Sequence, residues 1–230
     1  MNENPIIVAL DVDSVEEARR LVKTIGPRGG FYKVGLELYT VAGMPFVREL
    51  LAEGKQVFVD LKMYDIPETV KRAAAQVAQS GARFLTVHAV GQVMRAAREG
   101  SAGSRLELLA VTILTSFQQS DVEELGYSCP ISAVVESRAA AAMSAGMAGV
   151  IASPLEAAAV RRIVGPSALI VTPGVRSPGA AKGDQRRVAT PAEAVRHGAN
   201  YVVMGRQITR AADPADEFAR VLEEIGRRRL

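Results

Sequence analysis

Cysteine, long apolar runs and an excess of one charge are all scarce in this sequence. Cys129 is the only cysteine among 230 residues, which excludes an intramolecular disulfide and argues against a metal site built on cysteine. No run of about 18 apolar residues occurs, so the sequence contains no candidate membrane span. Lysine and arginine total 28 against 25 aspartate and glutamate residues, and this near balance argues against a nucleic-acid-binding surface.

The N-terminus also lacks the features of a secretory signal. It has no basic segment before its first apolar run, and Asp11 interrupts that run. Hydrophobic residues make up 48% of the chain, which is enough for one sizeable core. We therefore expect a cytoplasmic protein that binds neither membranes nor nucleic acid.

What the sequence does contain is a strict alternation of short apolar runs and amphipathic segments. Such alternation is typical of parallel strands connected by helices. Eight units in a chain of this length predict an α/β fold, a (β/α)8 TIM barrel that forms one domain over residues 1–230. A doubly wound open sheet is the alternative, and the absence of Gly-x-Gly-x-x-Gly after the first strand disfavours it. The predicted strands lie at residues 6–10, 31–36, 57–62, 84–88, 106–114, 149–153, 168–172 and 201–204.

The third predicted strand ends in charged residues, which is unusual for a buried strand. Asp60 and Lys62 are two residues apart and so point to the same side, and Asp65 follows in a turn that Pro67 closes. Removing each ion from water is costly unless partners offset it. A chain that gathers charges in such a place usually uses them for chemistry.

Other charged residues join this group if the fold is a barrel. Asp11 follows the first strand and Lys33 lies on the second, so both would meet Asp60 and Lys62 at the mouth formed by the carboxyl ends of the strands. Opposite charges in such a network keep each other ionised. A structural ion-pair network in the barrel is the alternative, and the placement of every member at a strand end favours a functional site.

The segments after strands seven and eight predict a phosphate-binding site. Thr-Pro-Gly-Val-Arg at residues 172–176 and Gly205-Arg206 supply backbone amides that a phosphate can approach, together with two arginine forks. Residues 177–185 between them are small and polar. They predict a lid that brings Gln185 to the phosphate, with an ordinary surface loop as the alternative.

The pattern Asp-x-Lys-x-x-Asp-Ile-x-x-Thr at residues 60–69 resembles the signature of the orotidine 5′-phosphate decarboxylase family. Further matches occur in the family's order and are similar to its bacterial type: Asp11, Lys33, Thr115, the Pro-Gly-Val-Arg loop, Gly183-Asp184-Gln185 and Gly205-Arg206. One departure is visible at residues 88–92, where the usual His-Ala-x-Gly-Gly reads His-Ala-Val-Gly-Gln. It affects the expected local turn and not the expected chemistry.

The resemblance implies decarboxylation of orotidine 5′-phosphate to UMP, in pyrimidine biosynthesis, without cofactor or metal. It implies that Lys62 donates the proton and that Asp60 lies beside the substrate carboxylate. It further implies a homodimer in which Asp65 and Thr69 reach into the partner's site. The remaining implied contacts are Asp11 and Lys33 to the ribose, Thr115 to the pyrimidine, and Arg176, Gln185, Gly205 and Arg206 to the 5′-phosphate.

Two other functions remain open at this stage. The 3-keto-L-gulonate 6-phosphate decarboxylases and hexulose-phosphate synthases share the Asp-x-Lys-x-x-Asp strand end, but they use Mg²⁺ and carry a carboxylate where this chain has Lys33. A cation there would repel the metal. A non-catalytic phosphate-binding barrel would need Arg176 and Arg206 but not Lys62 between carboxylates.

Overall fold

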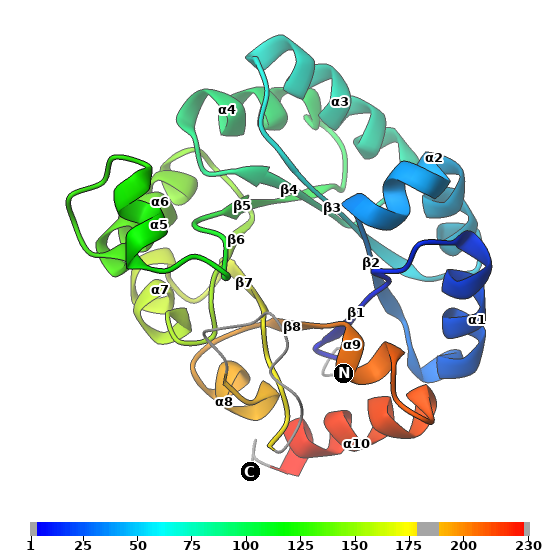
Figure 1. The fold of residues 1–230 in the computed structure, drawn as a ribbon. Helices are drawn as coiled ribbons and strands as arrows, with labels where there is room; N and C mark the ends of the chain where they lie inside the picture. Colours follow the sequence, from blue (N-terminus) through cyan, green and yellow to red (C-terminus); the bar gives the residue numbers. More distant parts are fainter. Residues whose placement is uncertain (1–3, 179–188, 228–230) are drawn as a thin grey trace.

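The structure is a computed structural model that describes residues 4–178 and 189–227. Its strands form a closed parallel barrel in the order of the chain, from β1 to β8, and β8 pairs with β1. Figure 1 shows the strands as a ring with the helices outside it. The predicted TIM barrel is therefore confirmed, and the alternative of an open sheet is wrong because the pairing of β8 with β1 closes the sheet and leaves none of these strands at an edge.

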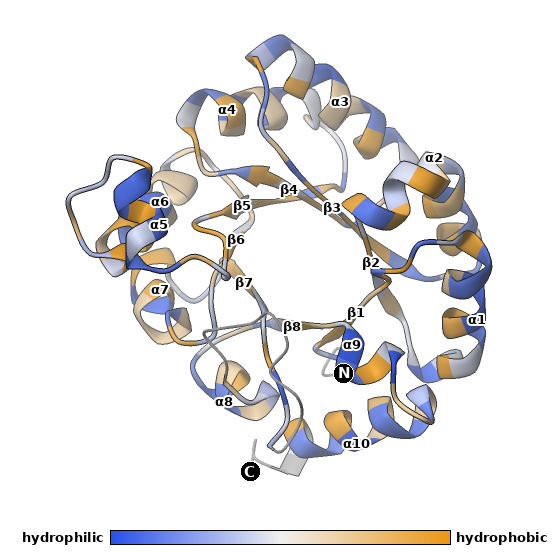
Figure 2. Cartoon of the chain, viewed as in Figure 1, coloured by the Kyte–Doolittle hydropathy of each residue, from blue (hydrophilic) through white to orange (hydrophobic). Residues whose placement is uncertain are grey.

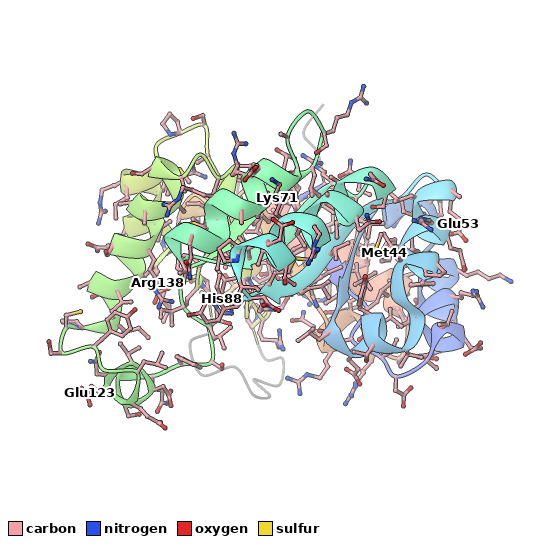
Figure 3. The ribbon with its side chains drawn as sticks, turned by 90° about the horizontal axis from the view of Figure 1, so that it is seen from above. Met44, Glu53, Lys71, His88, Glu123 and Arg138 are labelled. Atoms are coloured by element: carbon pink, nitrogen blue, oxygen red, sulfur yellow. The ribbon has the colours of Figure 1, made fainter. Side chains whose placement is uncertain are left out.

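The strands are β1 (Ile6–Ala9), β2 (Phe31–Gly35), β3 (Gln56–Met63), β4 (Phe84–His88), β5 (Glu107–Val111), β6 (Gly149–Ile151), β7 (Leu169–Pro173) and β8 (Tyr201–Met204). The helices are α1 (Val15–Ile25), α2 (Leu36–Ala52), α3 (Pro67–Ser80), α4 (Gly91–Gly100), α5 (Gln119–Glu124), α6 (Ile131–Ser144), α7 (Ala157–Val164), α8 (Pro191–Arg196), α9 (Arg206–Thr209) and α10 (Pro214–Arg227), with a 3-10 turn at Gly26–Arg28. α5 projects outward from the barrel in both Figure 1 and Figure 3, where Glu123 labels it.

Two differences from the sequence prediction bear on the site. The fifth strand was predicted to reach Leu114, but β5 ends at Val111, and the chain then leaves the sheet to line the cavity. The short helix α9 directly follows β8 and was not predicted, because it is only four residues long. It places Arg206 in its first turn, beside the mouth.

The helix starts follow from local chemistry. The Ser14 hydroxyl accepts a hydrogen bond from the Glu17 backbone N–H and so caps α1. Thr190 and Glu193 form a reciprocal capping box at the start of α8. Pro67 is the first residue of α3, where the missing N–H costs nothing.

The core consists of two apolar shells, because side chains alternate along each strand. Outward-pointing residues pack against the helices, and inward-pointing ones form a second cluster inside the barrel. Figure 2 shows the hydrophobic residues along the strands and the hydrophilic ones mainly on the outer helix faces. Within the described residues, no helix combines the length and the apolar character needed to cross a membrane.

Aromatic rings fill the barrel interior near the amino-terminal ends of the strands. The rings of Phe31, Phe84 and Tyr201 lie 5.1 to 5.7 Å apart between centroids, and Phe58 packs edge-on against Phe84 at 5.8 Å. The guanidinium of Arg83 lies 5.1 to 5.5 Å from three of these rings. This layer closes one end of the barrel and leaves the other end open for a site.

Candidate active site

The polar residues of the site form the next layer above the aromatic rings. Lys33 follows Phe31 by two residues, Asp60 follows Phe58 and Thr86 follows Phe84, so each polar side chain enters the barrel on the same face as the ring below it. Lys33, Phe58 and Asp60 belong to the wall of a cavity of about 580 Å³ at the carboxyl ends of the strands. The cavity wall contains Asp11, Lys33, Asp60 and Lys62, as the sequence predicted.

Lys33 lies between two carboxylates and is almost fully buried. Its amine donates to Asp11 Oδ1 at 2.7 Å and lies 3.6 Å from Asp60 Oδ2. Only 7% of Lys33 and 8% of Asp60 is exposed, whereas half of the Asp11 side chain is exposed. The buried cation is thus neutralised by carboxylates on two sides.

Lys62 makes the third ion pair of this charged group. Its amine donates to Asp60 Oδ2 at 2.8 Å. Together with Lys33, this places one carboxylate between two ammonium groups at the floor of the cavity. The alternating charges form a fixed electrostatic array that needs little reorganisation when a ligand charge changes.

A bulge in β3 brings Lys62 back toward Asp60. Val59 pairs with Leu85 and Met63 with Val87, so three residues of β3 lie opposite one residue of β4, Thr86. Lys62 has a φ of 45°, and it is the only non-glycine residue with a positive φ in the described part of the chain. Such a conformation is costly and tends to occur at functional sites.

Thr86 holds both members of this ion pair. Its hydroxyl accepts a hydrogen bond from the Lys62 backbone N–H at 3.0 Å and donates to Asp60 Oδ1 at 2.8 Å. The side chain is fully buried. Sequence reasoning assigned Thr86 to a strand and gave it no role, and only its two-residue spacing from Phe84 could have placed it in the polar layer.

The environment keeps Asp60 ionised. Burial by itself would raise the pKa of its carboxyl, but the charges of Lys33 and Lys62, with hydrogen bonds from Lys62 and Thr86, hold the pKa below its ordinary value. The carboxylate therefore faces the cavity as a fixed negative charge at neutral pH.

Gly35 makes room for the Lys33–Asp11 pair. A Cβ at this position would lie 2.7 Å from the Lys33 amine and 3.0 Å from Asp11 Oδ1, so any larger residue would displace the ion pair. The sequence contains no signal for this requirement, because it depends on contacts across two strands.

The other side of the cavity carries the arginines. Arg176, Gly205 and Arg206 line it as predicted, and Thr115 lines the wall next to β5. Gly174 has a φ of 79°, a left-handed conformation that favours glycine. At Gly205, by contrast, an added Cβ would meet its nearest protein atom at an ordinary 3.5 Å, so protein packing does not require glycine there.

Arg210 also lines the cavity and was missed by sequence reasoning. It follows α9, and its backbone N–H donates to the Arg206 carbonyl, which places the two arginines one turn apart. Within residues 4–178 and 189–227, its guanidinium makes no hydrogen bond or ion pair. The spacing Arg-x-x-x-Arg is the signal that could have identified it.

Two predicted residues lie outside the cavity wall, and one lies outside the described residues. Asp65 is exposed and accepts a hydrogen bond from the Ile66 backbone N–H, and Thr69 is partly buried at the start of α3. Neither lines the cavity of its own chain. Gln185 and most of the predicted lid at residues 177–185 fall outside the described residues.

The two histidines lie apart from the cavity wall. His88 packs against the Tyr64 ring at 5.4 Å, and Figure 3 labels it near Arg138. Burial, with the charges of Arg138 and Lys62, lowers the pKa of His88. His197 is the C-terminal cap of α8. Neither imidazole is positioned to act on a ligand in the cavity.

Comparisons with known proteins agree with this geometry. A family model described as "Orotidine 5'-phosphate decarboxylase / HUMPS family" matches residues 4–221. An orotidine 5′-phosphate decarboxylase from Methylobacterium sp. (strain 4-46) is 49% identical over 96% of this chain and 94% of its own length. One from Caulobacter sp. (strain K31) is 48% identical over 98% and 99%. The crystal structure of orotidine 5′-phosphate decarboxylase from Lactobacillus acidophilus is similar with a TM-score of 0.86 and 37% identity, over 97% of this chain and 99% of that one.

Proposed function

The chain belongs to the orotidine 5′-phosphate decarboxylase / HUMPS family, and we propose that it decarboxylates orotidine 5′-phosphate to UMP and CO₂. The family description covers two groups, so membership alone does not select the reaction. The relatives at 48% to 49% identity over nearly the full chain carry the name of the decarboxylase. The observation that carries the proposal is the buried array in which Asp60 lies between Lys33 and Lys62.

Lys33 also argues against the metal-dependent alternative. Its amine fills the space between Asp11 and Asp60, where a divalent cation would need carboxylate oxygens without a competing charge. A protonated amine beside these oxygens repels a metal ion. We therefore propose a reaction without metal or cofactor.

The chemistry requires stabilisation of a carbanion. Loss of CO₂ from C6 of the pyrimidine leaves an electron pair that the ring delocalises poorly. The Lys62 ammonium supplies a fixed positive charge at this carbon and then donates its proton to it. Asp60 lies next to the departing carboxylate and orients Lys62 through the 2.8 Å ion pair.

The rest of the nucleotide would lie along the remaining wall of the cavity. Asp11 and Lys33 would bind ribose hydroxyls, and Thr115 would contact the base; that all three line the cavity supports these roles. Arg176 and Arg206, with the Gly205 backbone and Gln185, would bind the 5′-phosphate. The room at Gly205 supports this assignment, because the missing Cβ serves a ligand and not the protein packing. Binding energy from the distant phosphate can then hold the site in its reactive geometry.

We further propose a cytoplasmic homodimer of single-domain chains spanning residues 1–230. Asp65 and Thr69 lie outside the cavity of their own chain, which supports their contribution to the partner's site. Tyr64 and Ile66 beside them expose about two thirds of their surface, 67% and 66%, which favours coverage by another subunit.

The test is an absorbance assay of purified protein with orotidine 5′-phosphate, with and without EDTA. We expect loss of the orotate absorbance and formation of UMP at equal rates under both conditions. Absence of turnover would refute the decarboxylase. Turnover that EDTA abolishes would point to the metal-dependent group, and phosphate binding without turnover would point to the non-catalytic barrel.

A further inference from the structure

Gln207 connects the segments that carry two of the cavity arginines, Arg176 and Arg206. Its carboxamide oxygen accepts a hydrogen bond from the Ser177 backbone N–H at 3.0 Å, and its nitrogen donates to the Ser177 hydroxyl at 2.8 Å. Ser177 directly follows Arg176, and Gln207 directly follows Arg206. We infer that Gln207 is a positioning residue that holds the two arginines at the separation that a phosphate group requires. This inference rests on the proposed function.

The contact occurs where the sheet no longer holds these segments together. The pairing of β7 with β8 ends at Pro173 and Val203. Ser177 and Gln207 lie beyond that last pair, each on its own segment. The two hydrogen bonds therefore take over from the sheet in fixing the separation of the two segments.

A third contact fixes the orientation of the amide. The Gln207 nitrogen also donates to Glu217 Oε1 on α10 at 2.7 Å. The ion pair with Arg220, and to a lesser extent Gln207, lower the pKa of Glu217, which stays negatively charged. A flipped amide would turn its oxygen toward this carboxylate and lose the Ser177 N–H, so one orientation is strongly preferred.

Burial makes the contact costly to lose. Ser177 is only 3% exposed, so its N–H and hydroxyl would have poor access to water if Gln207 were replaced by an apolar residue. The segment would then shift to find new partners and carry Arg176 with it. A misplacement of about 1 Å in a binding group can reduce the rate about 100-fold.

Replacing Gln207 should weaken only the binding of ligands that carry a phosphate. Gln207→Leu removes all three hydrogen bonds at similar side-chain volume. We expect dissociation constants for UMP and for inorganic phosphate to rise about tenfold or more, and the dissociation constant for uridine, which lacks the phosphate, to stay unchanged. Gln79→Leu, on the exposed face of α3, is the matched control and should change none of the three.

A charged variant adds a pH signature. Gln207→Glu keeps an acceptor for the Ser177 N–H but places a second carboxylate against Glu217. UMP binding should be weak at pH 8 and recover toward pH 5.5, as one proton becomes shared between the two carboxyl groups. A purely structural role would not produce this recovery.

The outcomes separate the two proposals. Equal weakening of UMP and uridine binding in Gln207→Leu, or no weakening, overturns the role of Gln207 while wild-type turnover leaves the proposed function intact. Wild-type protein that neither turns over orotidine 5′-phosphate nor prefers UMP to uridine refutes the proposed function itself. Should Gln207→Leu fail to fold, Ser177→Ala decides: it removes one hydrogen bond, and a smaller loss confined to UMP and phosphate supports the inference, whereas no such loss overturns it.

Discussion

At the scale of single residues, Lys62 combines a strained backbone with an amine whose position is fixed by an ion pair. Its φ of 45° persists because its backbone N–H is bound by the Thr86 hydroxyl and its amine by Asp60. Strain of this kind costs about 1 to 3 kcal/mol and needs surrounding contacts to maintain it. The residues around Lys62 thus hold its ammonium group in one position.

Replacement of Lys62 tests its proposed role as proton donor. Lys62→Ala should lower kcat by about four orders of magnitude or more, because both the charge at C6 and the proton are lost. Binding of UMP should remain measurable, since the phosphate and ribose contacts lie elsewhere. Steady-state rates and a binding titration distinguish these effects, with Lys71→Ala as control, because the Lys71 amine pairs with Glu99 of α4 away from the cavity wall. Near-normal turnover would remove the central assignment.

The environment of Asp60 predicts a pH effect on stability. Its folded pKa lies below the ordinary value of about 3.9, so the ionised form stabilises the fold above that pH. This contribution is lost as the pH falls through the lower, folded pKa. The difference in melting temperature between wild type and Asp60→Asn should therefore be constant from pH 7 to 5 and shift in favour of the variant below about pH 4. A difference that does not change with pH contradicts the assignment.

At the scale of elements, Arg161 joins the base of α7 to the turns that enter β7 and β8. Its guanidinium donates to the carbonyls of Gly165, Ala168 and Gly198 and to the side-chain oxygen of Asn200, at 2.5 to 3.3 Å. Burial lowers the pKa of this guanidinium. One side chain thereby satisfies four oxygens at the end of the barrel opposite the cavity.

Loss of this contact should reduce stability without changing the chemistry. Arg161→Ala leaves backbone carbonyls unsatisfied, and we expect the free energy of unfolding to fall by about 2 to 4 kcal/mol. The neighbouring exposed Arg162→Ala should change it by less than about 0.5 kcal/mol. Chemical denaturation gives both values, and kcat of folded Arg161→Ala should equal that of wild type. A fall in kcat would show that the base of the barrel is coupled to the site.

At the scale of the whole molecule, residues that stabilise the barrel lie at one end of its axis, and residues of the candidate site lie at the other. Aromatic rings in contact with the Arg83 guanidinium close one end. The charged layer begins two residues further along the same strands. The exposed turn at Tyr64–Ile66 and the position of Asp65 outside the cavity favour a site completed by a second subunit.

Mixing of two inactive variants tests this shared site. Lys62→Ala and Asp65→Ala should each be nearly inactive alone. After subunit exchange at equal amounts, half of the dimers are mixed, each with one intact site, so activity should recover to about a quarter of wild type. Recovery requires that Lys62 and Asp65 act in one site from different chains. Exchange without recovery, monitored by tagged subunits, would mean that Asp65 acts within its own chain.

Much of this arrangement could be predicted from the sequence. The order of strands and helices follows from periodicity, and the parallel topology then brings Asp11, Lys33, Asp60 and Lys62 to one mouth. These features are local, or they depend only on the fact that parallel strands end on the same side of a barrel. Residue spacing alone is sufficient to determine them.

Tertiary structure decided how those residues meet. The bulge opposite Thr86, the space that Gly35 leaves for the Lys33–Asp11 pair, and the bridge from Gln207 to Ser177 involve residues far apart in the chain. Each depends on the register between neighbouring strands or on loops that meet only when the barrel closes. A sequence pattern carries no information about such distances, because side-chain contacts across strands are selected by packing of the whole molecule.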